Sequence, residues 1–261
     1  MSTSRAAPPR SYDHVLWIVM ENHSLDQIIG SSEAPYINQL AAQHGLATNF
    51  YAESHPSLPN YIAMTSGSTQ GIADDDGPAS HRLDVPNLFS LLPGGGARSL
   101  LESMPANCAH SDSGNYAVRH NPQAYYVNLG GECAQYNVPL EDPPDLSARF
   151  TFITPNLIHD MHNGTVADGD TWLSTFMPKV LQSDPYTAGR TAVFITWDED
   201  DLLSANHIPT LVIAPSVPAG TRVSARLDHY AMLRATQEML GLTPLLGAAA
   251  TAADMRAPFS L

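Results

Sequence analysis

A carboxylate and an amide stand side by side at Glu21 and Asn22, directly after the continuous apolar run Val15–Met20. Such a run predicts a buried parallel strand, and ligand sites in open α/β sheets lie beyond the carboxyl ends of strands. Both side chains offer hard oxygen ligands of the kind that divalent cations prefer. The competing interpretation is a polar turn that leaves the strand, and this pair taken alone favours the turn.

Ser57 stands at the predicted start of a short helix, Ser57–Gly67, within the stretch HPSLPNY (55–61). Serine is a favoured N-cap and Pro59 a favoured first-turn residue, so a structural role explains both. The same position has a chemical use, because a helix N-terminus presents free N–H groups and the positive end of the helix dipole to a phosphate. A serine activated there by a metal ion can attack phosphorus.

Four consecutive acidic residues, Asp198–Asp201, follow a second apolar run, Thr191–Trp197, which also predicts a buried strand. Adjacent carboxylates repel one another unless a cation compensates their charge. A solvated acidic loop is the alternative. Because the acids and the Glu21–Asn22 pair would leave strands of the same sheet, a metal ion shared between them is the sharper hypothesis.

Three histidines stand at predicted loop or strand ends: His120, His162 and His229. A single histidine is more often a structural residue than a ligand, but imidazoles can bind phosphate oxygens or protonate a leaving alkoxide. The remaining sequence context gives no such role to four others, for which we expect structural positions: His14, His44, His81 and His110.

The elements that must position these residues alternate along the chain between strands and helices. The predicted strands are Val15–Met20, Phe150–Thr154, Thr191–Trp197 and Thr210–Ala214. The predicted helices are Ala34–His44, Ser57–Gly67, Val85–Leu92, Asp170–Gln182 and His229–Leu240. This alternation predicts an α/β fold, with a parallel sheet covered on both faces.

Residues 12–261 are expected to form one domain, since 261 residues suit a single α/β domain with one insertion. The insertion is residues 107–149, whose weak periodicity and many Asn, Pro, Gly and Tyr residues predict a loop-rich segment at the mouth of the pocket. Its tyrosines are expected to pack the loop down rather than to form a ligand platform. The polar, proline-bearing leader, residues 1–11, is expected to be disordered.

Composition excludes several classes of protein. Apolar residues make up 43 % of the chain, too many for a disordered protein. The 12 Lys and Arg against 26 Asp and Glu give a net charge of −14. This charge argues against a nucleic-acid partner, which would require a basic face. No apolar run approaches the about 20 residues that a membrane-spanning helix needs.

Cys108 and Cys133 are the two cysteines, and neither belongs to a CxxC pair that would indicate a zinc site. One disulfide between them would fit an exported protein, periplasmic or extracellular, whose signal peptide has been removed. Two free thiols in a cytoplasmic protein are the alternative.

Eight segments, taken in order, resemble one family, the bacterial phosphoesterases that include acid phosphatases and non-haemolytic phospholipases C. The segments are ENHS (21–24), HPSLPNY (55–61), RHNP (119–122), TPNLIHDMH (154–162), GDTWL (169–173), TWDED (196–200), NHIPTLVIAP (206–215) and DHYAMLRATQEMLGL (228–242). The resemblance extends over about residues 12–258. Their order along the chain carries the resemblance, since no single segment is specific.

The resemblance implies an alkaline-phosphatase-like three-layer α/β/α sandwich with a mostly parallel central sheet. It also implies one divalent ion (Mg, Ca, Mn or Zn) and a serine nucleophile at Ser57. The implied metal ligands are Glu21, Asn22, Ser57, Asp198 and Glu199. The implied catalytic histidines are His162 and His229, and the implied substrate contacts are His120, Asn60 and Asn22.

The expected reaction is therefore metal-dependent hydrolysis of a small-molecule phosphate monoester through a phosphoserine intermediate. The phospholipases C of the family are much longer, which favours a small phosphatase. Three alternatives stay open: a phosphodiesterase of the phospholipase C type, a non-catalytic metal- and phosphate-binding protein of the same fold, and transfer to an acceptor other than water. The substrate and the oligomeric state are left open by the sequence.

Overall fold

The apolar run before Glu21 forms a strand in the middle of a nine-stranded sheet in the computed structural model, which describes residues 11–261. The strands are β1 (His14–Met20), β2 (Gly45–Tyr51), β3 (Ala97–Leu101), β4 (Asn137–Pro139), β5 (Phe150–Thr154), β6 (Thr191–Trp197), β7 (His207–Ile213), β8 (Thr221–Val223) and β9 (Leu227–Asp228). Their order is β4-β3-β5-β1-β6-β7-β2-β8, and β9 pairs with β2. Only β7 runs antiparallel to its neighbours, so the sheet is mostly parallel.

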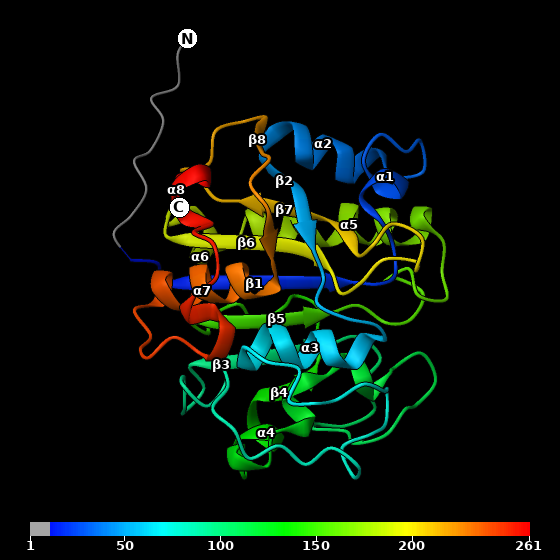
Figure 1. Cartoon of the computed structure of the whole chain (residues 1–261), viewed down its shortest axis with the longest axis vertical. Coiled ribbons are helices and arrows are strands. Elements are labelled where there is room, and N and C mark those ends of the chain that lie inside the picture. The colour runs from blue at the N-terminus through cyan, green and yellow to red at the C-terminus, as the bar shows by residue number, and fades with distance from the viewer. Residues whose placement is uncertain (1–10) are drawn as a thin grey trace.

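Helices cover both faces of this sheet (Figure 1). They are α1 (Leu25–Ile28), α2 (Pro35–Gln43), α3 (Ser57–Ser66), α4 (Glu132–Tyr136), α5 (Val166–Leu181), α6 (Asp184–Thr187), α7 (His229–Leu240) and α8 (Arg256–Phe259). Short 3-10 helices span Val118–His120, Pro122–Tyr125, Val127–Leu129 and Gly247–Ala250. In Figure 1, α3 and α7 lie in front of the sheet and pack on each other, whereas α5 lies behind it and packs on α2.

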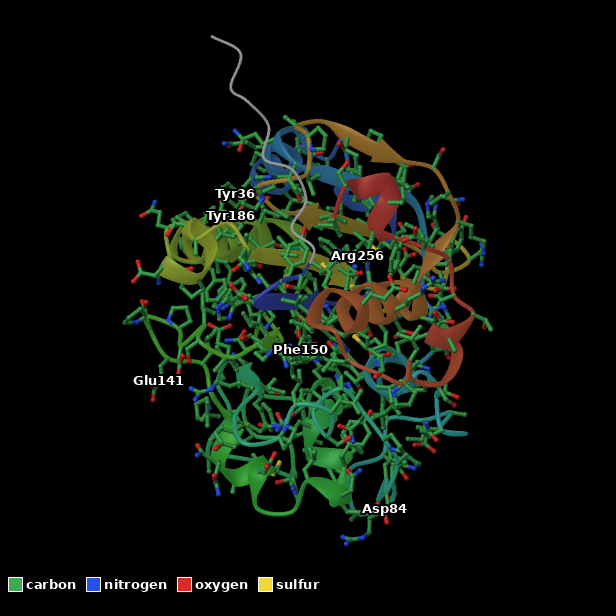
Figure 2. The ribbon with its side chains drawn as sticks, turned by 90° about the vertical axis from the view of Figure 1, so that its left-hand side faces the viewer. Tyr36, Asp84, Glu141, Phe150, Tyr186 and Arg256 are labelled. Atoms are coloured by element: carbon green, nitrogen blue, oxygen red, sulfur yellow. A yellow bond between two sulfur atoms is a disulfide. The ribbon has the colours of Figure 1, made fainter. Side chains whose placement is uncertain are left out.

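The core fills the space between the central strands and the helices. Every residue of β6 and all but the first of β1 are buried, as expected of strands covered on both faces. The Trp17 ring packs edge-to-face on Phe150, with 4.9 Å between centroids. Figure 2 looks onto the amino ends of the strands and shows Phe150 at the centre, with Asp84 and Glu141 at the periphery.

Most predicted elements are present, and three have the predicted bounds: β5, β6 and α7. Helix α3 ends where Gly67 adopts a left-handed backbone, with φ 78°, as a C-cap glycine allows. Helix α5 begins four residues before the predicted Asp170, because Thr165 caps it and Asp168 completes a capping box. No helix among residues 11–261 has the length and apolar character to cross a membrane.

One prediction about local structure is wrong. The segment Val85–Leu92 forms turns, because the Asn87 side chain accepts a hydrogen bond from Ser90 N, and Ser90 Oγ donates to the Asn87 carbonyl. These local bonds compete with helical ones. Strand β7 begins three residues before the predicted Thr210, and it runs antiparallel to both β6 and β2.

Residues 107–149 contribute more than loops, since they include α4, three of the 3-10 helices and the edge strand β4. A disulfide joins Cys108 to Cys133, as expected. Three of the segment's tyrosines are buried and pack it down as expected: Tyr116, Tyr125 and Tyr126. Of the predicted disordered leader, residues 1–10 lie outside the described part of the chain.

Candidate active site at the carboxyl edge of the sheet

The register of two central strands brings the acidic residues together. Strands β1 and β6 pair in parallel from His14 opposite Thr191 to Met20 opposite Trp197. The residues that follow are therefore neighbours too: Asp198 N donates to the Met20 carbonyl at 2.9 Å. Because β1 and β6 end level with each other, Glu21 and Asp198 emerge at the same edge of the sheet.

Asn22 continues this contact. Its backbone N–H donates to Asp198 Oδ1 at 3.2 Å, and its own backbone is left-handed, with φ 55°. Asparagine tolerates this conformation better than most residues. The side-chain oxygen Asn22 Oδ1 is buried and has no hydrogen-bond partner among the described residues, and the same is true of Asp198 Oδ2. A buried polar atom without a hydrogen-bond partner is a candidate to bind an ion or a water molecule, and these two oxygens are such candidates.

Ser57 reaches the acids from the start of α3. Its hydroxyl donates to Glu21 Oε2 at 3.2 Å and to Glu199 Oε1 at 3.3 Å, and the residue is buried. The next backbone N–H, that of Leu58, donates to the Asp75 side chain at 2.9 Å, and Pro59 has no N–H. The first turn of α3 therefore offers fewer free donors to a phosphate than we expected.

Asn60, an expected substrate contact, holds the loop before α3. Its oxygen accepts from the backbone N–H groups of Glu53 and Ser54 at 3.0 and 2.9 Å, and its nitrogen donates to the carbonyls of Ser54 and Pro56. Both ends of this buried amide are thus occupied by the loop. These contacts position Ser57 and give no support to a substrate contact, which stays a prediction.

Burial and mutual repulsion make the three acids hard to ionise together. Burial, then the charges of Asp198 and Asp160, raise the pKa of Glu21 well above its usual range. Burial raises the pKa of Asp198 to about 7. Burial and the neighbouring Asp198 raise the pKa of Glu199 to about 9. A cation held between them would relieve this repulsion.

The donor set fits a hard divalent cation. It comprises the carboxylates of Glu21, Asp198 and Glu199, the Asn22 amide oxygen and the Ser57 hydroxyl, all of them oxygen donors. Oxygen donors suit Mg²⁺, Ca²⁺ and Mn²⁺. Tyr61, one turn after Ser57 on α3, donates a short hydrogen bond to Glu21 and so orients this carboxylate from the side.

Two of the expected histidines lie next to Glu21. His120 Nε2 is 3.3 Å from Glu21 Oε1, and His120 Nδ1 is 3.2 Å from Asp160 Oδ2. The His162 ring lies beside it, with 5.7 Å between centroids, and Arg119 Nη2 donates to His162 Nε2 at 3.1 Å. Potential ligand atoms of Glu21, His120 and His162 all lie within 4.8 Å of one another.

Asp160 ties this group to the sheet. Its carbonyl accepts from Glu21 N at 2.8 Å, and its carboxylate accepts from His162 N at 2.8 Å. Burial, followed by the nearby Arg119 and His162, holds the pKa of His120 well below its usual range, so His120 is neutral near pH 7. We call Arg119, His120, Asp160 and His162 the histidine flank of the site.

His229 contacts the end of β6. It is buried at the start of α7, where its Nε2 is 3.0 Å from the Trp197 carbonyl and its ring packs against Phe50. A carbonyl only accepts, so Nε2 carries the proton. Within the described residues His229 has no hydrogen bond or ion pair with Ser57. Burial lowers its pKa to about 4.

Sequence reasoning missed His55, Tyr61, Arg119 and Asp160 as site residues. His55 Nδ1 is 2.5 Å from Glu199 Oε2, and His55 Nε2 is 3.3 Å from Asp200 Oδ1. His55 and Tyr61 stand in the same motif as Ser57, and Asp160 stands between two histidines. The signal available in the sequence was therefore that these residues lie within the segments that carry the family resemblance.

A pocket of about 470 Å³ opens beside Asn22 and Glu199, and no residue of the histidine flank is among those that line it. Its lining residues are Asn22, His55, Pro56, Glu199, Asp200, Asp201 and Leu202. It therefore contains two of the proposed metal ligands and the two residues that precede Ser57.

Comparison with known proteins agrees with this geometry. The model of the Phosphoesterase family matches residues 31–243. A phosphatidylinositol-3-phosphatase of Mycobacterium tuberculosis is 34 % identical over 241 residues, which cover 89 % of this chain and 78 % of that protein. An acid phosphatase of Aspergillus fumigatus is 28 % identical over 80 % of this chain, which spans 51 % of that longer protein.

Solved structures show the same fold. A protein of the alkaline phosphatase superfamily from Vibrio parahaemolyticus aligns with a TM-score of 0.63 at 14 % identity, over 98 % of this chain and 74 % of that one. The phosphonate monoester hydrolase of Agrobacterium radiobacter aligns with a TM-score of 0.61 at 12 % identity, over 95 % and 77 % of the two chains. The expected α/β fold of the alkaline-phosphatase type is confirmed. The match over most of the chain shows that this protein belongs to the Phosphoesterase family and is a hydrolase of phosphoric esters.

Proposed function

We propose that this protein is a metal-dependent phosphatase that hydrolyses phosphate monoesters through a phosphoserine at Ser57. The observation that carries the proposal is the position of Ser57 Oγ, which lies 3.2 Å from Glu21 and 3.3 Å from Glu199 at the carboxyl edge of the sheet. The relative named phosphatidylinositol-3-phosphatase supports a monoester as substrate.

The residues that would hold the divalent ion are Glu21, Asn22, Ser57, Asp198 and Glu199. When bound there, such an ion lowers the pKa of the serine hydroxyl and offsets negative charge on the phosphoryl oxygens. The Glu21 and Glu199 carboxylates are the acceptors of the hydroxyl hydrogen bonds, so they are the groups nearest to the proton that Ser57 must lose.

In this mechanism Ser57 Oγ attacks phosphorus in line, the bond to the leaving oxygen breaks, and a phosphoserine forms. Water then attacks the phosphoserine and releases inorganic phosphate. Arg119 supplies N–H groups to the phosphoryl oxygens, a role that falls to the histidine flank because Leu58 N–H is engaged by Asp75.

We assign the general acid to His162. It is half-buried and lies beside Glu21 and His120, and as the general acid it would carry its proton on Nε2 in place of the hydrogen bond that this atom accepts from Arg119. His229 contacts the carbonyl of the last residue of β6, directly before Asp198. We therefore give His229 a positioning role on the strand end that carries the proposed ligand.

The test of the nucleophile is Ser57→Ala assayed with p-nitrophenyl phosphate in the presence of Mg²⁺ or Mn²⁺. Loss of turnover is expected, and an unchanged rate would contradict the assignment. Ser80→Ala, at an exposed serine, is the matched control and should keep the wild-type rate. A phosphodiesterase is the second candidate, and bis(p-nitrophenyl) phosphate in the same assay separates the two.

The disulfide and the fungal acid phosphatase relatives fit a secreted protein. We propose that the enzyme acts in an oxidising compartment, periplasmic or extracellular, because disulfides form and persist there. Fractionation of the source cells, followed by detection of the chain, tests this location.

A further inference from the structure

Two leucines project from the loop that follows the acidic ligands. Leu202 and Leu203 are 73 % and 84 % exposed, the most exposed of the large apolar side chains in the described part of the chain. Leu202 lines the 470 Å³ pocket beside Asn22 and Glu199, whereas Leu203 is not among its lining residues. An exposed leucine at the wall of a site that contains the nucleophile's partners is placed to contact substrate.

The loop that carries Leu202 is held rigidly. The buried Asp200 carboxylate accepts from the backbone N–H groups of Leu202, Ser204 and Asn206 at 2.8, 2.8 and 2.9 Å. The Asn206 side chain donates to the Ser54 carbonyl at 2.9 Å and so ties the loop to the segment before Ser57. The backbone that carries Leu202 is therefore tied to the segment that precedes the nucleophile.

The backbone of Leu202 is unfavourable for leucine. Its φ of 71° lies in the left-handed region, where glycine and asparagine are far better tolerated. A leucine held there costs folding free energy and gains no buried contact, since the side chain is exposed. Strain of this kind is typical of functional positions, which supports a use for this side chain outside the fold.

Charge limits what the pocket can accept. Among the described residues no Lys or Arg lines it, and three acids do: Glu199, Asp200 and Asp201. A bound divalent ion would offset the charge of Glu199, but Asp201 stays as a negative charge at the rim. A leaving group with a further phosphate or carboxylate is repelled there, and a neutral hydrocarbon is not.

We propose that Leu202 contacts the leaving group of the substrate, and that the pocket selects monoesters of apolar alcohols or phenols over monoesters that carry further anionic groups. This inference rests on the proposed function, because it takes Ser57 as the nucleophile and the phosphoryl group as bound at the histidine flank. The occupant of the pocket is the hydrocarbon part of the substrate.

Binding of alkylphosphonates tests the pocket without turnover. The affinities of octylphosphonate and methylphosphonate are measured by calorimetry with Mg²⁺ present, for wild type, Leu202→Asn and Leu203→Asn. The octyl preference of the wild type should fall about tenfold in Leu202→Asn, because the apolar contact is lost. Asparagine suits the left-handed backbone, so this variant should fold. Leu203→Asn, on the same loop but outside the pocket, should keep the wild-type preference.

Turnover gives a second measurement. Hexyl phosphate should have a higher kcat/KM than the hexanediol bisphosphate of equal chain length, by about tenfold at low salt, and the gap should narrow as salt is added. An unchanged octyl preference in Leu202→Asn, or an equal loss in both leucine variants, would overturn the inference. If the wild type hydrolyses hexyl phosphate but shows neither preference, the proposed role of the pocket is contradicted and the proposed function is not. A wild type that binds octylphosphonate preferentially but hydrolyses no monoester contradicts the proposed function instead.

Discussion

The Ser57 hydroxyl donates to Glu21 Oε2 at 3.2 Å, although the two residues are 36 positions apart in the chain. Glu21 directly follows β1 and Ser57 begins α3, so the contact joins the carboxyl edge of the sheet to the layer of helices that covers one of its faces. The same glutamate accepts from Tyr61 and lies 3.3 Å from His120. Glu21 is thus the point at which the nucleophile, the proposed ion and the histidine flank meet.

Because the three acids are crowded, we predict that the dependence of folding stability on pH changes when a metal ion binds. Burial raises the pKa of Glu21, Asp198 and Glu199, so the metal-free folded state binds more protons than the unfolded state at neutral pH. This contribution is fully present below about pH 4, where these acids are protonated in both states, and is lost as pH rises toward 9. Melting temperatures in a chelator should therefore fall over this range, and saturating Mn²⁺ should restore them.

Glu21→Gln is the companion variant, since it removes one of the crowded charges. In chelator above pH 7 it should melt at a higher temperature than the wild type, yet gain little from added Mn²⁺. A variant that is stabilised by Mn²⁺ as much as the wild type would remove Glu21 from the proposed ligands.

Tyr61→Phe should weaken metal binding with little change in the fold. The substitution deletes the hydroxyl that donates to Glu21 and leaves the ring, which stacks on His120 with 5.3 Å between centroids. Loss of an outer partner of a metal ligand costs about 10- to 100-fold in metal affinity or activity. Metal titration followed by calorimetry measures the change. Tyr126→Phe, whose hydroxyl contacts Thr65, is the control and should bind metal as the wild type does.

His162→Asn should slow the hydrolysis of alkyl phosphates far more than that of p-nitrophenyl phosphate. An alkoxide needs a proton as it leaves, whereas p-nitrophenolate does not, and general acid catalysis contributes about a hundredfold or more. The measurement is kcat for both esters at one pH. Equal losses for the two esters would show that His162 binds the phosphoryl group without protonating the leaving oxygen.

His229→Gln should make stability less sensitive to acid. Burial lowers the pKa of His229 to about 4 in the folded state, against about 6.5 when unfolded. The folded state therefore binds fewer protons, and stability present above pH 6.5 is lost as pH falls toward 4, by about 2 kcal/mol at pH 5. Glutamine keeps a donor for the Trp197 carbonyl but does not titrate. Denaturant unfolding at pH 5 and 8 measures the effect, with the exposed His110→Gln as control.

The local sequence pattern was sufficient to predict a strand or a helix where the signal for it lies within one segment. The apolar runs that became β1 and β6, and the glycine that ends α3, are such signals. Ser57 is the first residue of α3 as predicted, but it is not the N-cap: the N-cap is Pro56, and no side chain caps the helix. Strand direction is not among them, because an apolar run reads the same for a parallel and an antiparallel strand. The antiparallel pairing of β7 therefore had no signal in the sequence.

The site was predicted only in part, because some of its contacts follow from the order of the strands and others depend on how distant segments pack. Glu21 and Asp198 could be placed together because both follow strands of one sheet, and the register of β1 with β6 confirms this proximity. The contact of His55 with Glu199 depends on how the loop before α3 packs against the acidic loop, which is a long-range property of the fold. The spacing of residues in the sequence likewise does not indicate that His229 points toward the Trp197 carbonyl.

The most direct test of the central claim is to trap the covalent intermediate. The enzyme, loaded with Mg²⁺ or Mn²⁺, is mixed with p-nitrophenyl phosphate and quenched in acid within milliseconds, and its peptides are examined by mass spectrometry. We expect one phosphoryl group on Ser57, absent from Ser57→Ala. Hydrolysis at the wild-type rate by Ser57→Ala, or a phosphoryl group trapped on another residue, would contradict the account.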